Sequence, residues 1–179
     1  MVAGKAQVRD RRSGWGLAVP FADDDIAAAV ARGLDAARDR AQPDDVGRTP
    51  EKYADLGRDF RAGAWKHLRE DGDLPQASNK AWGMVAETVK AVSARHGGII
   101  HQHRSIWEVV RQLSSLVGES GDIHTRHWIN NSFMVARGLH SNFYEDEADH
   151  VEVTGGLELC EELSERLYEL FWPEGGTQS

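Results

Sequence analysis

Apolar residues recur at every third or fourth position along most of the chain, a pattern that is typical of amphipathic helices. No segment alternates apolar and polar residues over the length of a strand, so a β-sheet is not expected. The pattern predicts helices at about residues 23–41, 49–70, 75–97, 103–117, 122–145 and 154–172.

The ends of these segments contain residues that begin or stop helices. Thr49, Asp73, Asp122 and Thr154 each stand where a side-chain oxygen can accept a hydrogen bond from the first turn of a helix. A Gly-Gly pair follows the third segment, and Pro173 follows the last one. These signals support the helix boundaries that the periodicity predicts.

The segment at 122–145 has the broadest apolar face, which indicates a helix buried in the middle of a bundle. The helices from 75 to 172, with short connections, favour an antiparallel four-helix bundle, and the two earlier helices would pack against its side or mediate dimerisation. The expected parts are a flexible basic arm at 1–20, an N-terminal helix and linker at 21–48, the helical bundle domain at 49–172 and a flexible tail at 173–179.

The composition is that of a folded protein without a membrane segment. Of the 179 residues, 40% are hydrophobic and 28% are charged, which excludes a disordered chain. No apolar stretch suits a membrane helix or a signal peptide, so we expect a cytoplasmic protein. Cys160 is the only cysteine, which excludes an internal disulfide and a cysteine-based zinc site.

Charge is distributed unevenly along the chain. The formal net charge of −8 opposes non-specific binding to DNA. Residues 1–12 are nevertheless basic, and residues 145–174 are strongly acidic. The tail and the acidic segment either stay solvated or contact a partner of opposite charge.

Two blocks of sequence suggest a family. Residues 72–97 read GDLPQASNKAWGMVAETVKAVSARHG and residues 136–145 read ARGLHSNFYE. In these blocks the chain resembles the PaREP1 family of helical proteins, and the resemblance extends over about residues 68–170. That family is similar in turn to the HEPN superfamily of helical bundles, many of which are ribonucleases or partners of nucleotidyltransferases. The resemblance implies an all-α, HEPN-like antiparallel four-helix bundle that forms a homodimer.

HEPN ribonucleases have an arginine and a histidine with four to six residues between them, so the histidine lies five to seven positions further on. His140 matches that histidine, and Tyr144 is the aromatic residue that often follows. Arg137, however, lies only three residues before His140, so the pair departs from the motif. An i, i+3 pair still shares a helix face, so Arg137 and His140 could act together on a phosphate. A buried structural role for His140 stays open, because it lies on an apolar stripe.

Other residues suggest a binding surface. Lys80, Trp82, Glu87 and Lys90 fall near one face of the 75–97 segment and could hold a nucleotide or a peptide, although surface salt bridges would also explain the charged ones. The further candidates near His140 are Asn142 and Glu145.

Histidine spacing suggests a possible metal site. His101 and His103, with His124 and His127, could together supply four nitrogens to zinc or nickel. Histidines at helix ends also cap carbonyl groups or lie exposed, which is the competing interpretation. No dinucleotide fingerprint, phosphate loop or nucleophile elbow occurs, so no cofactor is expected.

These observations favour an accessory module that binds a nucleotide, RNA or a partner protein and does not catalyse a reaction. A metal-independent ribonuclease with a displaced Arg/His pair is the first alternative. A metal-binding protein that uses the histidines is the second.

Overall fold

The computed structural model describes residues 21–40 and 48–172, and this part of the chain is all α-helical. A π-helical turn, η1 (His67–Asp71), follows α2 directly. The α-helices are α1 (Asp23–Ala37), α2 (Pro50–Lys66), α3 (Leu74–Arg95), α4 (His103–Glu119), α5 (Ile123–Glu145) and α6 (His150–Phe171). The predicted basic arm, linker and tail fall largely outside the described residues.

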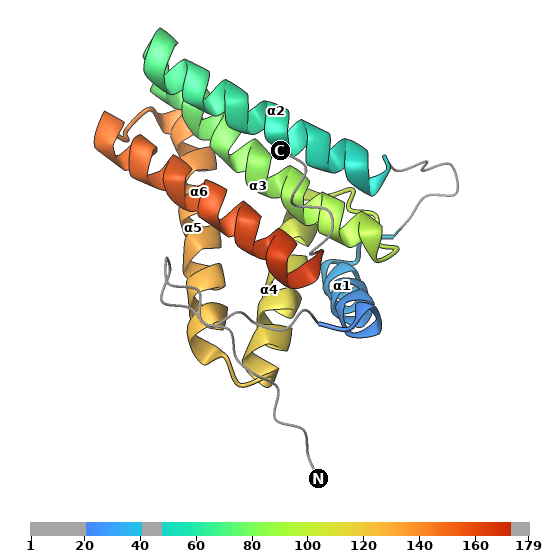
Figure 1. Ribbon diagram of the computed structural model, residues 1–179. Coiled ribbons are helices and arrows are strands. Elements are labelled where there is room, and N and C mark those ends of the chain that lie inside the picture. The colour runs from blue at the N-terminus through green and yellow to red at the C-terminus, as the bar shows by residue number, and fades with distance from the viewer. Residues whose placement is uncertain (1–20, 41–47, 173–179) are drawn as a thin grey trace.

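Helix α3 is the centre of the structure. It contacts α2, α4, α5 and α6, whereas α1 packs chiefly against α4. Figure 1 shows α2, α3 and α6 side by side, with the α4–α5 hairpin crossing them. The prediction that the 122–145 helix is the buried central one is therefore wrong. Its outward face leaves Met134 and Val135 at 50% and 40% exposure.

The all-α class is confirmed, but the antiparallel four-helix arrangement is not. His96 follows α3 directly, and Phe171 is the last residue of α6. The Nε2 atom of His96 lies 2.9 Å from the carbonyl oxygen of Phe171. Near the other ends of both helices, Asn142 donates a hydrogen bond to Ser78 and accepts one from the backbone of Ala148. Helices α3 and α6 therefore run in the same direction, because the α4–α5 hairpin returns the chain to the start of α3.

Side-chain caps explain where most helices begin. The oxygens of Thr49, Asp73 and Asp122 accept hydrogen bonds from the backbone N–H groups three residues further on, as predicted. The predicted cap at Thr154 is wrong. Helix α6 begins four residues earlier, at a capping box that Asp149 and Glu152 form.

The core consists of the apolar stripes of the helices. The predicted stripes of α3, α4 and α6 are buried, and they include Cys160, whose pKa burial raises to about 12. Helices α1 and α4 approach closely at Gly33, where a Cβ atom would lie 2.7 Å from the Cα atom of Val109. Helix α1 ends at Ala37 because Arg38 adopts a left-handed conformation, with φ 54°.

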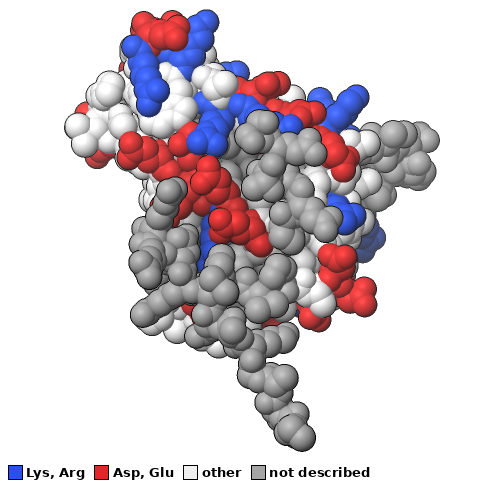
Figure 2. Space-filling model, in the orientation of Figure 1, with Lys and Arg blue, Asp and Glu red and all other residues white. Residues whose placement is uncertain are grey.

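Several acidic residues of α6 are exposed, namely Glu152, Glu158, Glu162, Glu165 and Glu169. Figure 2 shows a band of acidic side chains across this part of the molecule, with basic side chains beside it. Glu161 and Glu165 pair there with Arg61 of α2, at 2.6 and 3.3 Å. Within the described ranges, no helix has the length and apolar character needed to cross a bilayer.

Candidate functional site

A pocket of about 330 Å³ opens between α3, α4 and α5. Its volume lies at the small end of the range of ligand sites. None of its lining residues is acidic, although the protein as a whole is acidic. We call it the aromatic–basic pocket. It is lined by Trp82, His103, Arg104, Trp107, Phe133, Arg137, His140 and Ser141.

Aromatic rings form the walls of this pocket. Trp82 lies edge-on to Phe133, with ring centroids 5.7 Å apart, and Trp107 stacks on the same Phe133 at 5.6 Å. Phe133 is fully buried and contacts both indole rings, so it holds them in place. His140 completes the wall by stacking on Trp82, with centroids 5.3 Å apart and an angle of 26° between the rings. The stacked rings form a preformed aromatic wall that a flat ligand in the pocket could pack against.

His140 lines the pocket and is half-buried. Its Nδ1 atom is buried and has no hydrogen-bond partner among the described residues. Burial lowers the pKa of His140, and the neighbouring His103, whose ring centroid is 5.7 Å away, lowers it further. The imidazole is therefore neutral near neutral pH. Since a buried polar atom normally has a partner, Nδ1 marks a position where a ligand or a water could bind.

Two guanidinium groups stand at the pocket. Arg137 lies over the ring of Trp107, with 5.8 Å between its Cζ atom and the ring centroid. Arg104 donates a hydrogen bond from Nη2 to the carbonyl oxygen of Ala37, in the last turn of α1. A guanidinium has five N–H donors in a planar fork that matches a phosphate, so both groups suit an anionic ligand.

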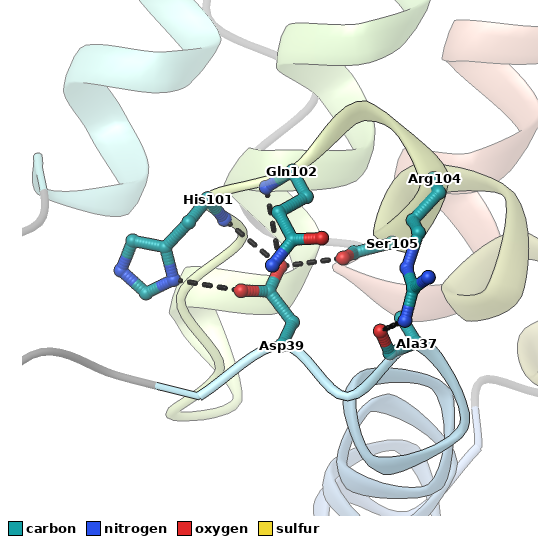
Figure 3. A network of polar contacts seen from close by, with 6 residues as sticks. All are labelled: Ala37, Asp39, His101, Gln102, Arg104 and Ser105. Carbon is teal, nitrogen blue, oxygen red and sulfur yellow. Dashed lines mark hydrogen bonds and ion pairs between the residues drawn. The ribbon is translucent and has the colours of Figure 1, made fainter.

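A buried carboxylate holds the part of α4 that supplies Arg104. Asp39 follows α1, and its side chain is only 1% exposed. It accepts hydrogen bonds from the backbone N–H groups of His101 and Gln102, at 3.0 and 3.2 Å, and from the hydroxyl of Ser105. Figure 3 shows these contacts beside the one between Arg104 and Ala37. These hydrogen bonds connect the end of α1 to the first turn of α4.

The pKa of Asp39 reflects this environment. Burial acts to raise the pKa, but the hydrogen bonds from Ser105, His101 and Gln102 outweigh it and hold the pKa below its usual range. The side chain of His101 also contacts Asp39. Its Nδ1 atom lies 3.0 Å from Oδ1 of the carboxylate. Asp39 is therefore charged at neutral pH and stabilises the contact between the two helices.

The structure separates the charged binding candidates of α3 from Trp82. Lys80 lies over Phe60 of α2, 5.0 Å from the ring centroid. Lys90 pairs with the buried Glu87, with 2.6 Å between Nζ and Oε1. These three side chains of α3 are not among the residues that line the aromatic–basic pocket, whereas Trp82 is. Their ion pair and ring contact favour a role in packing against α2.

The candidates after His140 lie in different surroundings. Asn142 is buried, and its Oδ1 accepts hydrogen bonds from the backbone of Glu147 and Ala148, so it shapes the turn after α5. Tyr144 is 74% exposed and lies edge-on to His140, with centroids 5.7 Å apart. Glu145 is the exposed last residue of α5. Of the three, only Tyr144 contacts a residue of the pocket through an observed ring interaction.

The four histidines proposed as metal ligands do not gather. His101 and His103 lie at the start of α4, whereas His124 and His127 lie in the first turns of α5, at the far end of the hairpin. Residues 21–40 and 48–172 contain no group of three or more His, Cys, Asp or Glu side chains placed to hold a metal ion. His103 instead lines the aromatic–basic pocket.

Several residues of the site carry no motif signal in the sequence. Trp107, Arg104 and Asp39 match none of the motifs described above. The spacing of His103 and Arg104 from Trp107 could have suggested a shared helix face, because residues three and four apart lie together. No local pattern indicates the contact between Asp39 and the start of α4, since the partners are more than sixty residues apart.

The comparison with protein families agrees with the resemblance found in the two sequence blocks. No curated protein and no solved structure matches the chain. The profile of the archaeal PaREP1/PaREP8 family matches residues 61–164, which is more than half of the chain. The matched segment includes every residue that lines the aromatic–basic pocket. The chain therefore belongs to the archaeal PaREP1/PaREP8 family.

Proposed function

We propose that this protein binds a nucleotide in the aromatic–basic pocket and acts as an accessory binding module without catalysis. The observation on which the proposal rests is that two tryptophans, two arginines and two histidines line one cavity that contains no acidic side chain. A nucleotide has a flat base that stacks on indole rings and a phosphate that guanidinium groups bind.

The pocket offers groups that suit both parts of such a ligand. Trp82 and Trp107 offer the stacking surface, and each base that stacks on an aromatic side chain contributes about 1–3 kcal/mol. Arg104 and Arg137 offer donors for the phosphate. The buried Nδ1 of His140 is a polar atom that still needs a partner.

Calorimetric titration of the protein with adenosine, guanosine, cytidine and uridine monophosphates tests the proposal. Arg137→Ala should weaken binding by about tenfold or more, because a hydrogen bond to a charged group contributes about 1.5–3 kcal/mol. Arg69→Ala is the matched control, since Arg69 also lies over a tryptophan, Trp65, but outside the pocket. Absence of binding by all four nucleotides, or equal loss in both variants, would contradict the proposal.

A second candidate function is cleavage of RNA without a metal ion. It is favoured by the position of Arg137 and His140 in the same pocket, where a neutral imidazole can accept a proton. The test is cleavage of a labelled RNA in the presence of a chelator. His140→Ala should abolish cleavage, whereas His127→Ala, an exposed histidine on the same helix, should not. Absence of cleavage by the unaltered protein eliminates this candidate.

The homodimer that the family resemblance implies stays a prediction, as does the cytoplasmic location. Light scattering of the purified protein measures the mass directly. A mass near twice 19.9 kDa would support the dimer.

A further inference from the structure

We propose that the site takes two nucleosides joined by a phosphate, and that a second hollow beside the end of α1 holds the second nucleoside. This inference rests on the proposed binding of a nucleotide in the aromatic–basic pocket. The second hollow has a volume of about 290 Å³. It is lined by Ala36, Ala37, Arg38, Arg104, Trp107 and Glu108.

The two hollows share a wall. Arg104 and Trp107 line both of them. Helix α4 packs against α1 on one side and against α5 on another, so its first two turns separate the hollows. Glu108 follows Arg104 by four residues and therefore lies on the same face of α4. A ligand that occupies both hollows would therefore lie beside Arg104 and Trp107.

Arg104 is held in a position that suits the linking phosphate. One of its N–H groups donates to the carbonyl oxygen of Ala37, which leaves other donors of the planar fork to bind an anion. The backbone around it is also fixed, because Asp39 accepts hydrogen bonds from His101 and Gln102 directly before α4 (Figure 3). A guanidinium anchored in this way loses less entropy when it binds a phosphate.

The second hollow offers aromatic surface and a hydrogen-bond acceptor to a second nucleoside. Its lining includes Trp107 and the carboxylate of Glu108, which pairs with Arg111 at 2.7 Å, and Arg38 and Arg104 add positive charge. The carboxylate can accept hydrogen bonds from sugar hydroxyls and base amino groups. A dinucleoside monophosphate has a second base for this hollow, and a nucleoside triphosphate does not.

Titration of the full chain with a dinucleoside monophosphate, a nucleoside triphosphate and a mononucleotide tests the inference. The dinucleoside monophosphate should bind at least about fivefold more tightly than the mononucleotide, since it adds one stacked base. The triphosphate should show no comparable gain. Ribose and deoxyribose forms of the dinucleotide distinguish an RNA-like from a DNA-like source, and a gain by either form supports the site.

Two substitutions test whether the additional affinity for the dinucleotide arises in the second hollow. Ala36→Leu fills the hollow from an exposed helix position, and Glu108→Gln removes the negative charge while keeping the shape. Both should remove most of the additional affinity for the dinucleotide and leave the affinity for the mononucleotide unchanged. Ala28→Leu, on an exposed position of the same helix, is the control and should keep the gain. Circular dichroism verifies that each variant is folded.

The outcomes separate the two proposals. If the mononucleotide binds and the dinucleotide binds no better, the second hollow is not part of the site, and the proposed function stands. A gain that survives both Ala36→Leu and Glu108→Gln also overturns the inference. If neither ligand binds, the proposed function fails and the inference fails with it.

Discussion

His140 has a chemical environment that differs from that of an exposed histidine. It is stacked on Trp82, half-buried, and adjacent to His103, and its pKa is lowered by burial first and by His103 second. The charged and titratable groups around it are His103 and Arg104 of α4 with Arg137 and Tyr144 of α5, while α3 contributes the uncharged Trp82. At neutral pH the imidazole is available as a hydrogen-bond acceptor or as a donor from one nitrogen.

Binding of a phosphodiester should depend on pH through this histidine. A bound anion stabilises the protonated imidazole, so affinity should rise as the pH falls through the pKa of His140. A dinucleoside monophosphate is the suitable ligand, because its phosphodiester does not titrate near neutral pH. Calorimetry between pH 8 and 5.5 measures the slope. His140→Gln should reduce it, and His127→Gln should leave it unchanged; a slope that is the same in all three proteins would refute a role for His140.

At the scale of elements, a buried carboxylate, Asp39, strengthens the contact between α1 and α4. Asp39→Asn should lower the free energy of unfolding by about 2 kcal/mol at pH 7, because hydrogen bonds to a charged group are replaced by weaker neutral ones. Since the folded-state pKa of Asp39 lies below its usual value, its contribution is complete above pH about 3.9 and is lost as the pH falls through the folded-state pKa. Urea denaturation of both proteins at several pH values measures this.

Asp35→Asn provides the control for Asp39. Asp35 is an exposed acid on the last turns of α1, so its substitution should have little effect. The difference in free energy of unfolding between Asp39→Asn and the unaltered protein should shrink as the pH falls. A difference that stays the same down to pH 3 would contradict the role given to Asp39.

Replacing glycine by alanine should change the stability of the protein in opposite directions at two positions. A Cβ atom at Gly33 would clash with the backbone of Val109, so Gly33→Ala should destabilise the protein by about 1–3 kcal/mol. At Gly155 of α6 a Cβ atom meets nothing within 4 Å, and Gly155→Ala should stabilise by about 0.5–1 kcal/mol. Thermal melts monitored by circular dichroism should give shifts of opposite sign. Shifts of the same sign would show that α1 does not pack on α4 as described.

The sequence predicts the helices well because helix formation depends on nearby residues. The caps at Thr49, Asp73 and Asp122 were identified correctly, since each acts on amides only three residues away. The prediction of a cap at Thr154 is wrong, because a threonine before an apolar run resembles a helix start, whereas Asp149 and Glu152 form the capping box in the structure. In the structure Thr154 donates instead to the carbonyl of His150 within the helix.

The arrangement of the helices and the site could not be predicted in the same way. Periodicity gives the apolar face of each helix but not its partner, so it did not indicate that α3 and α6 run in the same direction. His140 and Arg137 were identified as candidates, and both line the pocket. Trp82 also lines the pocket, whereas Lys80, Glu87 and Lys90 do not. Arg104 and Trp107 become part of the site only through contacts that the fold creates.

At the scale of the whole molecule, the pocket contrasts with the acidic surface around it. The protein has a formal net charge of −8, and acidic side chains follow α6 across one face (Figure 2). The aromatic–basic pocket nevertheless brings arginine and histidine side chains together at the junction of α3, α4 and α5. A local positive charge within an acidic protein directs an anionic ligand to one place and disfavours binding elsewhere.

A nucleotide bound against the indoles of the aromatic–basic pocket would change their surroundings, and proton–nitrogen correlation NMR of the tryptophan side chains tests this most directly. Addition of a mononucleotide should shift the indole N–H signals of Trp82 and Trp107 in a saturable way. The signals of Trp65 and Trp172, which lie outside the pocket, should stay in place. No saturable shift at Trp82 and Trp107, or an equal shift at Trp65 and Trp172, would contradict the account.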